Sequence, residues 1–293
     1  QPPHPPSPTP RITIQSMIWR DDPAKIRPML ATLAEPPLTG AGLVFEPKYD
    51  GIRALVHVAP RRGGPEVRIW SRLGNDKTSQ FPAIAAALAE AAAGWKDPVL
   101  LDGEIVALDP EGRPIGFQNL QGRIHLTDAR DIERIESQHP VALIAFDILR
   151  DGDDDVRGLP LTERRQRLER RLGAKAAAKG RARKPGVIRI SEQVAADGRA
   201  LHQRALREGW EGLIVKEARA PYHSGRRSPC WRKLKVVNEQ EFVIGGWTEP
   251  RQTRQHFGAL LLGVHDDDDP SVLRYVGHTG TGFDQKELAR VAA

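Results

Sequence analysis

The sequence has little cysteine and no long apolar run. Cys230 is the only cysteine among 293 residues, so the chain can form neither an internal disulfide nor a metal site with several thiolates. No stretch approaches the roughly 18 apolar residues that a membrane-spanning helix needs. No short apolar segment near the start precedes a signal-cleavage pattern. These absences predict a cytoplasmic protein without a membrane partner, whose stability comes from packing.

Basic residues moderately exceed acidic ones. The 44 Lys and Arg side chains outnumber 38 Asp and Glu, and the resulting formal charge of +6 suits a polyanionic partner without requiring one. Apolar residues make up 39% of the chain, enough for the core of one large domain or of a catalytic domain with a smaller partner. The proline-rich opening QPPHPPSPTPR can bury little. We assign residues 1–20 to a linker or chain boundary.

Short β-branched runs separated by turn residues predict a strand-rich first domain. They are LVFEPK, IRALVHVA, EVRIWS, VLLDGEIVAL, VALIAFDI, GVIRI and GLIVKE. Two segments are typical of helices: PAIAAALAEAAAG, which begins at Pro82, and LTERRQRLERRLG, with Thr162 as N-cap and Gly173 at its end. After Val237, EFVIGGW, GALLLGV and VLRYVG predict strands of a small barrel. We therefore expect domains at 21–238 and 239–293.

The segment EPKYDGIRA concentrates functional side chains. If the chain is extended there, Lys48 and Asp50 share one face, Gly51 permits a tight backbone and Arg53 follows closely. A lysine attacks phosphorus only as the neutral amine, so a nucleophilic Lys48 needs burial or nearby positive charge. The alternative is a strand end and turn with an exposed ion pair.

Further cations and carboxylates could complete a phosphate site. Lys233 and Lys235 alternate in WRKLK, which places both on one face of a strand; an exposed basic strand would look the same. Glu104 and Glu211 lie in strand-like segments and offer the oxygen ligands of a divalent cation. Mg²⁺ takes only one or two protein carboxylates, so Glu211 alone could suffice, although either glutamate could be an ordinary strand-end residue.

One aromatic residue has two interpretations. Phe146 in VALIAFDIL would most often belong to the core, yet an aromatic ring at a strand end can present its face to a base. Asp147 beside it is a candidate supporting residue.

The order of these segments decides between the alternatives. KYDGIR, SRLG, DGEIV, FDIL, EGLIVK and WRKLK follow one another over most of the chain, and this series resembles the motifs of the covalent nucleotidyltransferases, which include DNA ligases, RNA ligases and mRNA capping enzymes. Within them the chain is most similar to the ligase module of bacterial end-joining DNA ligases, through PMLA, FQNLQGRI, YHSGRRSPCWRKLK and EFVIGGWTEP.

This resemblance implies a fold. We expect an α+β nucleotidyltransferase domain of ATP-grasp-like type, with antiparallel sheets flanked by helices, at 21–238. A partial OB-fold at 239–293 is expected to follow, because the sequence offers too few strands for a complete barrel. We expect the chain to be a fragment of a longer enzyme.

The resemblance also implies a role for each site residue. Lys48 would attack the α-phosphate of ATP and hold AMP covalently. Glu46 would recognise adenine, Phe146 would stack on it and Glu104 would contact the ribose. The remaining candidates would handle phosphate and metal: Lys233 and Lys235 on the AMP phosphate, Glu211 and Asp50 on Mg²⁺ or Mn²⁺, and Arg53 and Arg72 on AMP or the 5′-phosphate of a nick.

The implied activity is ATP-dependent DNA ligation. AMP would pass from the lysine to the 5′-phosphate of nicked double-stranded DNA, and the 3′-hydroxyl would then expel it. The likeness implies a monomer that acts at the nucleoid in double-strand break repair, with the end-joining factor Ku as a partner. An RNA ligase, a capping-type guanylyltransferase and a non-catalytic nucleic-acid-binding module are the alternatives.

Overall fold

The computed structural model describes residues 17–176, 186–236, 241–250 and 256–292. Most of the predicted N-terminal linker and the predicted start of the second domain at 239 lie outside these residues. The chain divides into two compact units between Val236 and Val237. In the described part, no helix is long and apolar enough to cross a membrane.

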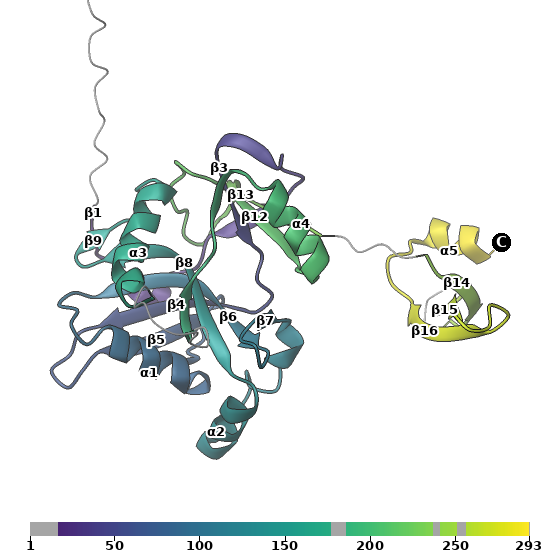
Figure 1. The fold of residues 1–293 in the computed structure, drawn as a ribbon, viewed down its shortest axis with the longest axis horizontal. Coiled ribbons are helices and arrows are strands. Elements are labelled where there is room, and N and C mark those ends of the chain that lie inside the picture. The colour runs from purple at the N-terminus through teal and green to yellow at the C-terminus, as the bar shows by residue number, and fades with distance from the viewer. Residues whose placement is uncertain (1–16, 177–185, 237–240, 251–255, 293) are drawn as a thin grey trace, which may run out of the picture. The chain divides into compact units, whose positions relative to one another are not determined.

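The larger sheet of the first unit follows the order β1-β9-β8-β6-β4-β5, with β7 beside β6 and β10 parallel to β8 (Figure 1). Its sequences alternate: on β4, Ala54, Val56 and Val58 face one side, and Arg53 and Leu55 face the other. The strands are β1 (Met17–Ile18), β4 (Ile52–Ala59), β5 (Glu66–Ser71), β6 (Val99–Leu108), β7 (Pro114–Ile115), β8 (Val141–Asp151), β9 (Asp154–Asp155) and β10 (Ile188–Ile190).

Helices α1 (Pro82–Ala91) and α3 (Leu161–Ala176) cover one face of this sheet. Their apolar residues join those of β4, β5, β6 and β8 in the main core. Pro82 opens α1 as predicted, since its missing N–H is not needed in a first turn. The predicted bounds of α3 are wrong: Thr162 lies inside the first turn, and the helix passes through Gly173 to Ala176. Packing on β8 and β10 overrides the weak helix propensity of glycine there.

The second sheet of this unit has the order β11-β3-β12-β13-β2, with β2 parallel to β13. Helix α4 (Arg199–Glu208) packs on its outer face, where Leu201 and Ala205 meet Phe45, Leu213 and Val215. The helix ends at Gly209 in the left-handed conformation, which glycine adopts without strain. The strands are β2 (Leu30–Leu33), β3 (Thr39–Pro47), β11 (Val194–Asp197), β12 (Gly212–Glu217) and β13 (Arg227–Lys235).

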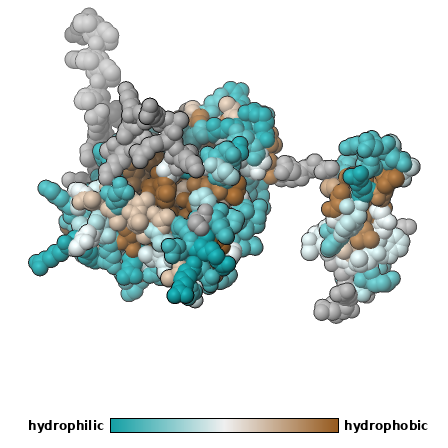
Figure 2. Space-filling model, turned by 60° about the horizontal axis from the view of Figure 1, so that its bottom comes forward, coloured by the Kyte–Doolittle hydropathy of each residue, from teal (hydrophilic) through white to brown (hydrophobic). Residues whose placement is uncertain are grey.

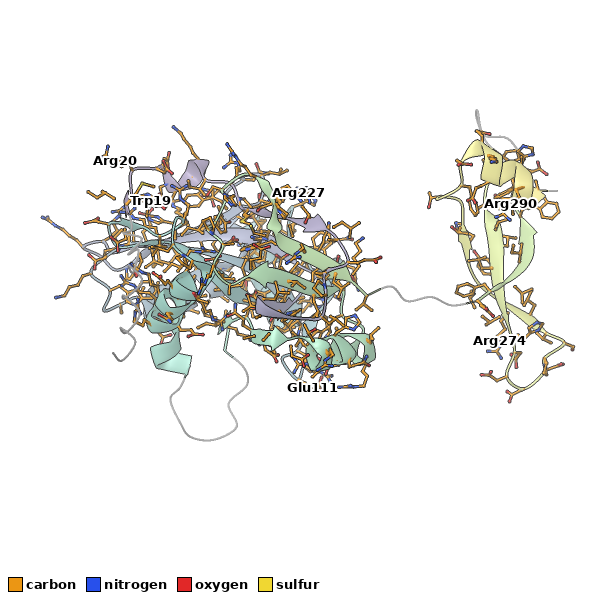
Figure 3. All side chains as sticks on the ribbon, turned by 90° about the horizontal axis from the view of Figure 1, so that it is seen from above. Trp19, Arg20, Glu111, Arg227, Arg274 and Arg290 are labelled. Carbon is orange, nitrogen blue, oxygen red and sulfur yellow. The ribbon has the colours of Figure 1, made fainter. Side chains whose placement is uncertain are left out.

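The inner faces of the two sheets share an apolar cluster. Leu55, Leu100 and Phe146 from the larger sheet pack with Met29 and Trp231 from the second sheet and its approach. Side chains fill the interior of the unit, whereas labelled residues such as Arg20, Glu111 and Arg227 lie at its periphery (Figure 3). Short helices and a further α-helix complete the connections: η1 (Pro23–Lys25), η2 (Thr78–Gln80), η3 (Phe117–Asn119) and α2 (Ala129–Gln138).

The second unit is a small sheet covered by one helix. Its strands follow the order β14-β15-β16, all antiparallel, and confirm the three strands predicted after Val237. Leu260 and Phe257 pack beneath Leu288 of the helix. Other hydrophobic side chains remain at the surface of this unit (Figure 2), among them Val243, Ile244, Leu273 and Val276. The elements are β14 (Val243–Trp247), β15 (Leu260–His265), β16 (Leu273–Thr279) and α5 (Gln285–Ala292).

Candidate active site

A pocket of about 130 Å³ lies between the inner faces of the two sheets. Drug-sized ligands occupy pockets of roughly 300 to 1,000 Å³, so this one can house only part of a nucleotide, such as its base. Strands of both sheets line it, with Ala31, Glu46, Pro47, Lys48, Tyr49, Arg53, Glu104, Phe146, Ile214, Lys216 and Trp231. Sequence segments far apart in the chain thus meet at one place.

The register of the second sheet sorts the site residues into three rows. Because paired residues on adjacent strands point to the same face, each row presents its side chains together. The backbone N–H of Lys48 donates to the Gly212 carbonyl at 2.9 Å, which continues the pairing just beyond β3. The rows are the tryptophan row (Val44, Lys216, Trp231), the glutamate row (Glu46, Ile214, Lys233) and the lysine row (Lys48, Gly212, Lys235).

Lys233 and Lys235 therefore share one face of β13, the face that also carries Trp231. Neither lysine is among the residues that line the pocket itself. They lie beside it, in the rows of Glu46 and Lys48. This is where the phosphates of a nucleotide would emerge if its base filled the pocket.

Lys48 forms an ion pair with Glu211. Its Nζ contacts a carboxylate oxygen of Glu211, which directly precedes β12, and both side chains are partly exposed. Lys48 lies in the short connection from β3 to β4. The backbone hydrogen bond between Lys48 and Gly212 holds it in place. The ammonium group in this ion pair must lose a proton before its nitrogen can act as a nucleophile.

Phe146 lies at a β-bulge of β8. On β6, Asp102 pairs with Asp147 and Gly103 pairs with Ala145, so Phe146 has no partner opposite. Ala145 and Ile148 on either side of the bulge both pack in the main core, whereas Phe146 packs in the apolar cluster between the sheets. The ring is 7% exposed and lines the pocket. Phe146 thus belongs both to the apolar cluster between the sheets and to the pocket wall. The core position and the position facing a ligand, which were alternatives in the sequence analysis, are therefore compatible.

Cations and a second aromatic ring surround Phe146. Trp231 meets it edge to face at 6.2 Å between centroids. The Arg53 guanidinium lies 4.5 Å from the Phe146 centroid, and Lys216 Nζ lies 4.6 Å from it. Such contacts stabilise a ring in a fixed orientation.

Asp147 points to the opposite side from Phe146. Its carboxylate accepts hydrogen bonds from Arg164 Nε at 2.7 Å and Arg164 Nη2 at 2.9 Å, and neither side chain is exposed. Arg164 belongs to α3, so this ion pair fastens the helix to the strand that carries Phe146. The geometry fits the supporting role expected for Asp147.

Arg53 is held by a carboxylate that the sequence analysis did not single out. Asp102 accepts from Arg53 Nε at 2.6 Å and from Nη2 at 2.7 Å. Burial is the largest influence on Arg53 and would lower its pKa, but the charge and hydrogen bonds of Asp102, together with the nearby Tyr222 and Glu104, raise the pKa overall. Arg72, in contrast, is exposed in the turn after β5 and does not line the pocket.

A buried ion pair between Glu46 and Lys216 was also missed. Lys216 Nζ lies 2.8 Å from a Glu46 oxygen, and each side chain is 2% exposed. Gln193 Nε2 donates to Glu46 at 2.8 Å, and Ser191 Oγ donates at 3.2 Å. Burial lowers the pKa of Lys216 against the opposing effect of Glu46. The signal in the sequence was a lysine in the middle of the apolar run GLIVKE, in phase with Ile214.

Glu104 lies on the pocket wall opposite Lys48. Burial raises its pKa to about 8, although Arg53 and Lys48 partly oppose this shift. A carboxyl group with this pKa is largely protonated near neutral pH. It can therefore donate a hydrogen bond as well as accept one.

The two expected metal ligands differ in their surroundings. Among the described residues, no group of three or more His, Cys, Asp and Glu side chains could hold a metal ion. Asp50 accepts a hydrogen bond from the Phe117 backbone N–H at 3.0 Å and so caps η3. Glu211 is partly exposed and faces Lys48. Mg²⁺ takes one or two carboxylates and fills the rest of its coordination shell with water and phosphate, so Glu211 fits such an ion. Asp50 would have to give up its hydrogen bond to Phe117 before it could bind the same ion.

A larger cavity elsewhere lacks the basic side chains that would bind phosphate. It measures about 590 Å³ and lies where η2 and α1 meet α2, lined by Ser79, Pro82, Ala83, Thr127, Ala129, Ile132, Glu133 and Glu136. These residues provide two carboxylates and no cation. We therefore take the smaller pocket between the sheets as the candidate active site.

The chain matches two protein families. The family described as "ATP dependent DNA ligase domain" matches residues 28–235, and that described as "ATP dependent DNA ligase C terminal region" matches residues 253–293. Together these matches cover most of both units.

Curated relatives agree with these families. The multifunctional non-homologous end joining protein LigD of Pseudomonas aeruginosa is 39% identical over 271 residues, which are 92% of this chain and 29% of that protein. A DNA ligase of Methanothermobacter thermautotrophicus is 32% identical over 273 residues, which are 91% of this chain and 46% of that protein. The chain thus spans less than half the length of these relatives.

Solved structures give the same fold. The mycobacterial DNA ligase D complexed with ATP and MES has a TM-score of 0.58 and 33% identity, and the match covers 92% of this chain and 76% of that one. The ligase domain of M. tuberculosis LigD has the same TM-score and identity, with 92% and 77% covered. The expected α+β nucleotidyltransferase fold with OB-like strands after it is confirmed.

Proposed function

The chain belongs to the ATP-dependent DNA ligase family, and from this premise we propose that it seals nicks in duplex DNA through a covalent adenylate on Lys48. The observation that carries the proposal is the position of Lys48. It lies at the mouth of a pocket that an aromatic ring lines, in one row with Lys235 and next to the row of Lys233. A nucleophile, a base pocket and two phosphate-binding cations thus meet.

The first step transfers AMP to the protein. The neutral amine of Lys48 attacks the α-phosphorus of ATP, a nitrogen–phosphorus bond forms, and the bond to the β-phosphate oxygen breaks, which releases pyrophosphate. Lys48, which is paired with Glu211, must first lose a proton. Lys233 and Lys235 stabilise negative charge on the phosphate as it transfers.

Binding of the nucleotide divides between the two sheets. Phe146 stacks on adenine, and Glu46 recognises the edge of the base. Glu104, on the larger sheet, contacts the ribose; with its raised pKa it can donate a hydrogen bond to a hydroxyl group. Lys216, between Glu46 and Phe146, is a further binding residue that the geometry adds.

Two later steps join the DNA. The 5′-phosphate of a nick takes AMP from Lys48, and the 3′-hydroxyl then attacks that phosphate and expels AMP. We assign contact with AMP or the 5′-phosphate to Arg53, which lines the pocket, and to Arg72, which is exposed outside it. Glu211, with Asp50 if it leaves η3, would hold Mg²⁺ or Mn²⁺, which neutralises phosphate charge when bound.

The likeness to the end-joining LigD proteins supports a role in double-strand break repair. Recruitment by Ku rests on this likeness alone, as does action as a monomer. Nicked double-stranded DNA is the substrate we expect, and nicked RNA tests the alternative acceptor.

Label transfer from ATP labelled at the α-phosphate tests the proposal. We expect the wild-type chain and the control Lys96→Ala to become labelled and Lys48→Ala to remain unlabelled with its fold intact, because alanine offers no amine. Lys96 is exposed and is not among the residues that line the pocket. Mass spectrometry should find the AMP adduct on the peptide that contains Lys48. An adduct on another lysine, or none on the wild type, would refute the proposal.

A further inference from the structure

A closed ring of hydrogen bonds joins the two sheets behind the pocket. The Tyr222 hydroxyl donates to Asp102 Oδ2 at 2.5 Å and accepts from the Met29 backbone N–H at 2.9 Å. Arg53 binds both carboxylate oxygens of Asp102, and its Nη2 donates to the Met29 carbonyl at 3.3 Å. Each of the four residues therefore contacts two others of the ring.

The ring spans elements that nothing in the sequence brings together. Arg53 and Asp102 lie on β4 and β6 of the larger sheet. Met29 directly precedes β2, and Tyr222 lies in the connection between β12 and β13, so both lie next to strands of the second sheet. Tyr222 is 4% exposed, and Met29 and Asp102 are fully buried. Water cannot replace a bond in this ring without entering the core.

Tyr222 is the neutral donor of the ring. Burial, and then the charge of Asp102, raise the pKa of Tyr222 well above its ordinary value, so the phenol keeps its proton and donates it to the carboxylate. With Arg53 it satisfies both oxygens of Asp102. The aromatic ring of Tyr222 also meets Trp231 edge to face at 5.6 Å, a contact that does not need the hydroxyl.

The hydrogen bonds of this closed ring determine which nitrogen of the Arg53 guanidinium remains free to bind a ligand. Nε and Nη2 are used by Asp102 and Met29, and in the described part of the chain Nη1 donates to no group. Arg53 lines the pocket, with its guanidinium against Phe146. Because a guanidinium is planar, fixing two of its nitrogens also fixes the direction of the third.

We propose that Tyr222 is a positioning residue that, through Asp102, orients Arg53 against Phe146 and thereby raises the affinity of the pocket for the nucleotide. This inference rests on the proposed function, since it takes the pocket to bind ATP. Tyr222 touches no ligand in this scheme. Its hydroxyl acts only by restraining the carboxylate that holds Arg53.

Tyr222→Phe isolates the hydroxyl, because the ring contact with Trp231 remains. We expect the dissociation constant for ATP, measured by titration in EDTA so that no adenylate forms, to rise about two- to tenfold, which is the range of one net hydrogen bond. The rate of label transfer at saturating ATP and Mg²⁺ should stay within about twofold. Tyr275→Phe is the matched control: its hydroxyl bonds His278 in the second unit, and its ATP affinity should not change.

A double-mutant cycle separates positioning from general loosening of the fold. In an Arg53→Lys background the charge opposite Asp102 remains but the planar fork is lost, so adding Tyr222→Phe should change ATP affinity no further. If Tyr222→Phe weakens ATP binding equally in both backgrounds, or has no effect in the wild type, the inference is overturned. If the wild-type chain binds ATP but takes no label on Lys48, the proposed function fails instead, and the cycle still reports on Tyr222.

Discussion

Replacing Phe146 by leucine separates its role in the core from its role in the pocket. Leucine keeps most of the buried apolar volume but removes the ring, which lies 6.2 Å from Trp231 and within 4.6 Å of two cations. The lost ring contacts are worth on the order of 1 to 3 kcal/mol of unfolding free energy. If adenine stacks on the ring, ATP affinity should also fall by about 1 to 3 kcal/mol.

Affinity and stability can be measured on the same variant. Titration with ATP in EDTA should show a rise in the dissociation constant of about five- to 150-fold, which corresponds to that loss. Urea unfolding reports stability. Phe45→Leu is the control: Phe45 is fully buried on the outer face of the second sheet, under α4, so it should lower stability and leave ATP affinity unchanged. Phe146→Leu with reduced stability but unchanged affinity would show that Phe146 serves the core alone.

Two further predictions follow from buried charges. Arg164→Met leaves Asp147 buried without its partner and should lower the free energy of unfolding, measured by urea titration, by about 3 to 5 kcal/mol. Arg170→Met, at an exposed position of the same helix, is the control. Equal unfolding free energies for the two variants would contradict this account. Glu104 keeps its proton up to about pH 8 in the folded chain but loses it near pH 4.5 in the unfolded chain. Its contribution to the free energy of unfolding therefore declines as the pH rises between these values, by at most about 1.4 kcal/mol per pH unit. Glu104→Gln should remove that slope, and an unchanged slope would assign the pH dependence to other groups.

The strands could be predicted because their local pattern agrees with their environment. Alternating β-branched runs became β3, β4, β5, β6, β8, β10 and β12. The bounds of α3 could not be predicted, since Gly173 is a stop signal only where packing does not continue the helix. Helix α4 was not predicted, although Leu201 and Ala205 lie four residues apart and Gly209 follows its end; its apolar side is covered by Phe45 and Leu213.

The candidate site was predictable as a set of residues and not as a set of contacts. Alternation alone places Lys233 and Lys235 on one face. The partners of Arg53 and Glu46 depend on which strands are neighbours, and no period in the sequence encodes that Lys216 lies beside Glu46. The bulge at Phe146 is equally hidden, because it arises from the pairing of β8 with β6.

The three rows of the second sheet give the site a direction. The tryptophan row contributes aromatic surface, the glutamate row a hydrogen-bonding carboxylate, and the lysine row the residue that we propose as the nucleophile. Successive rows are two residues apart along a strand, about 6.6 Å. Under the proposed function, a nucleotide with its base at the tryptophan row would extend along the strands, and its α-phosphate would reach the lysine row without crossing to another strand. Regular pairing of three strands would then set the distance between base recognition and attack, which a flexible loop could not hold constant.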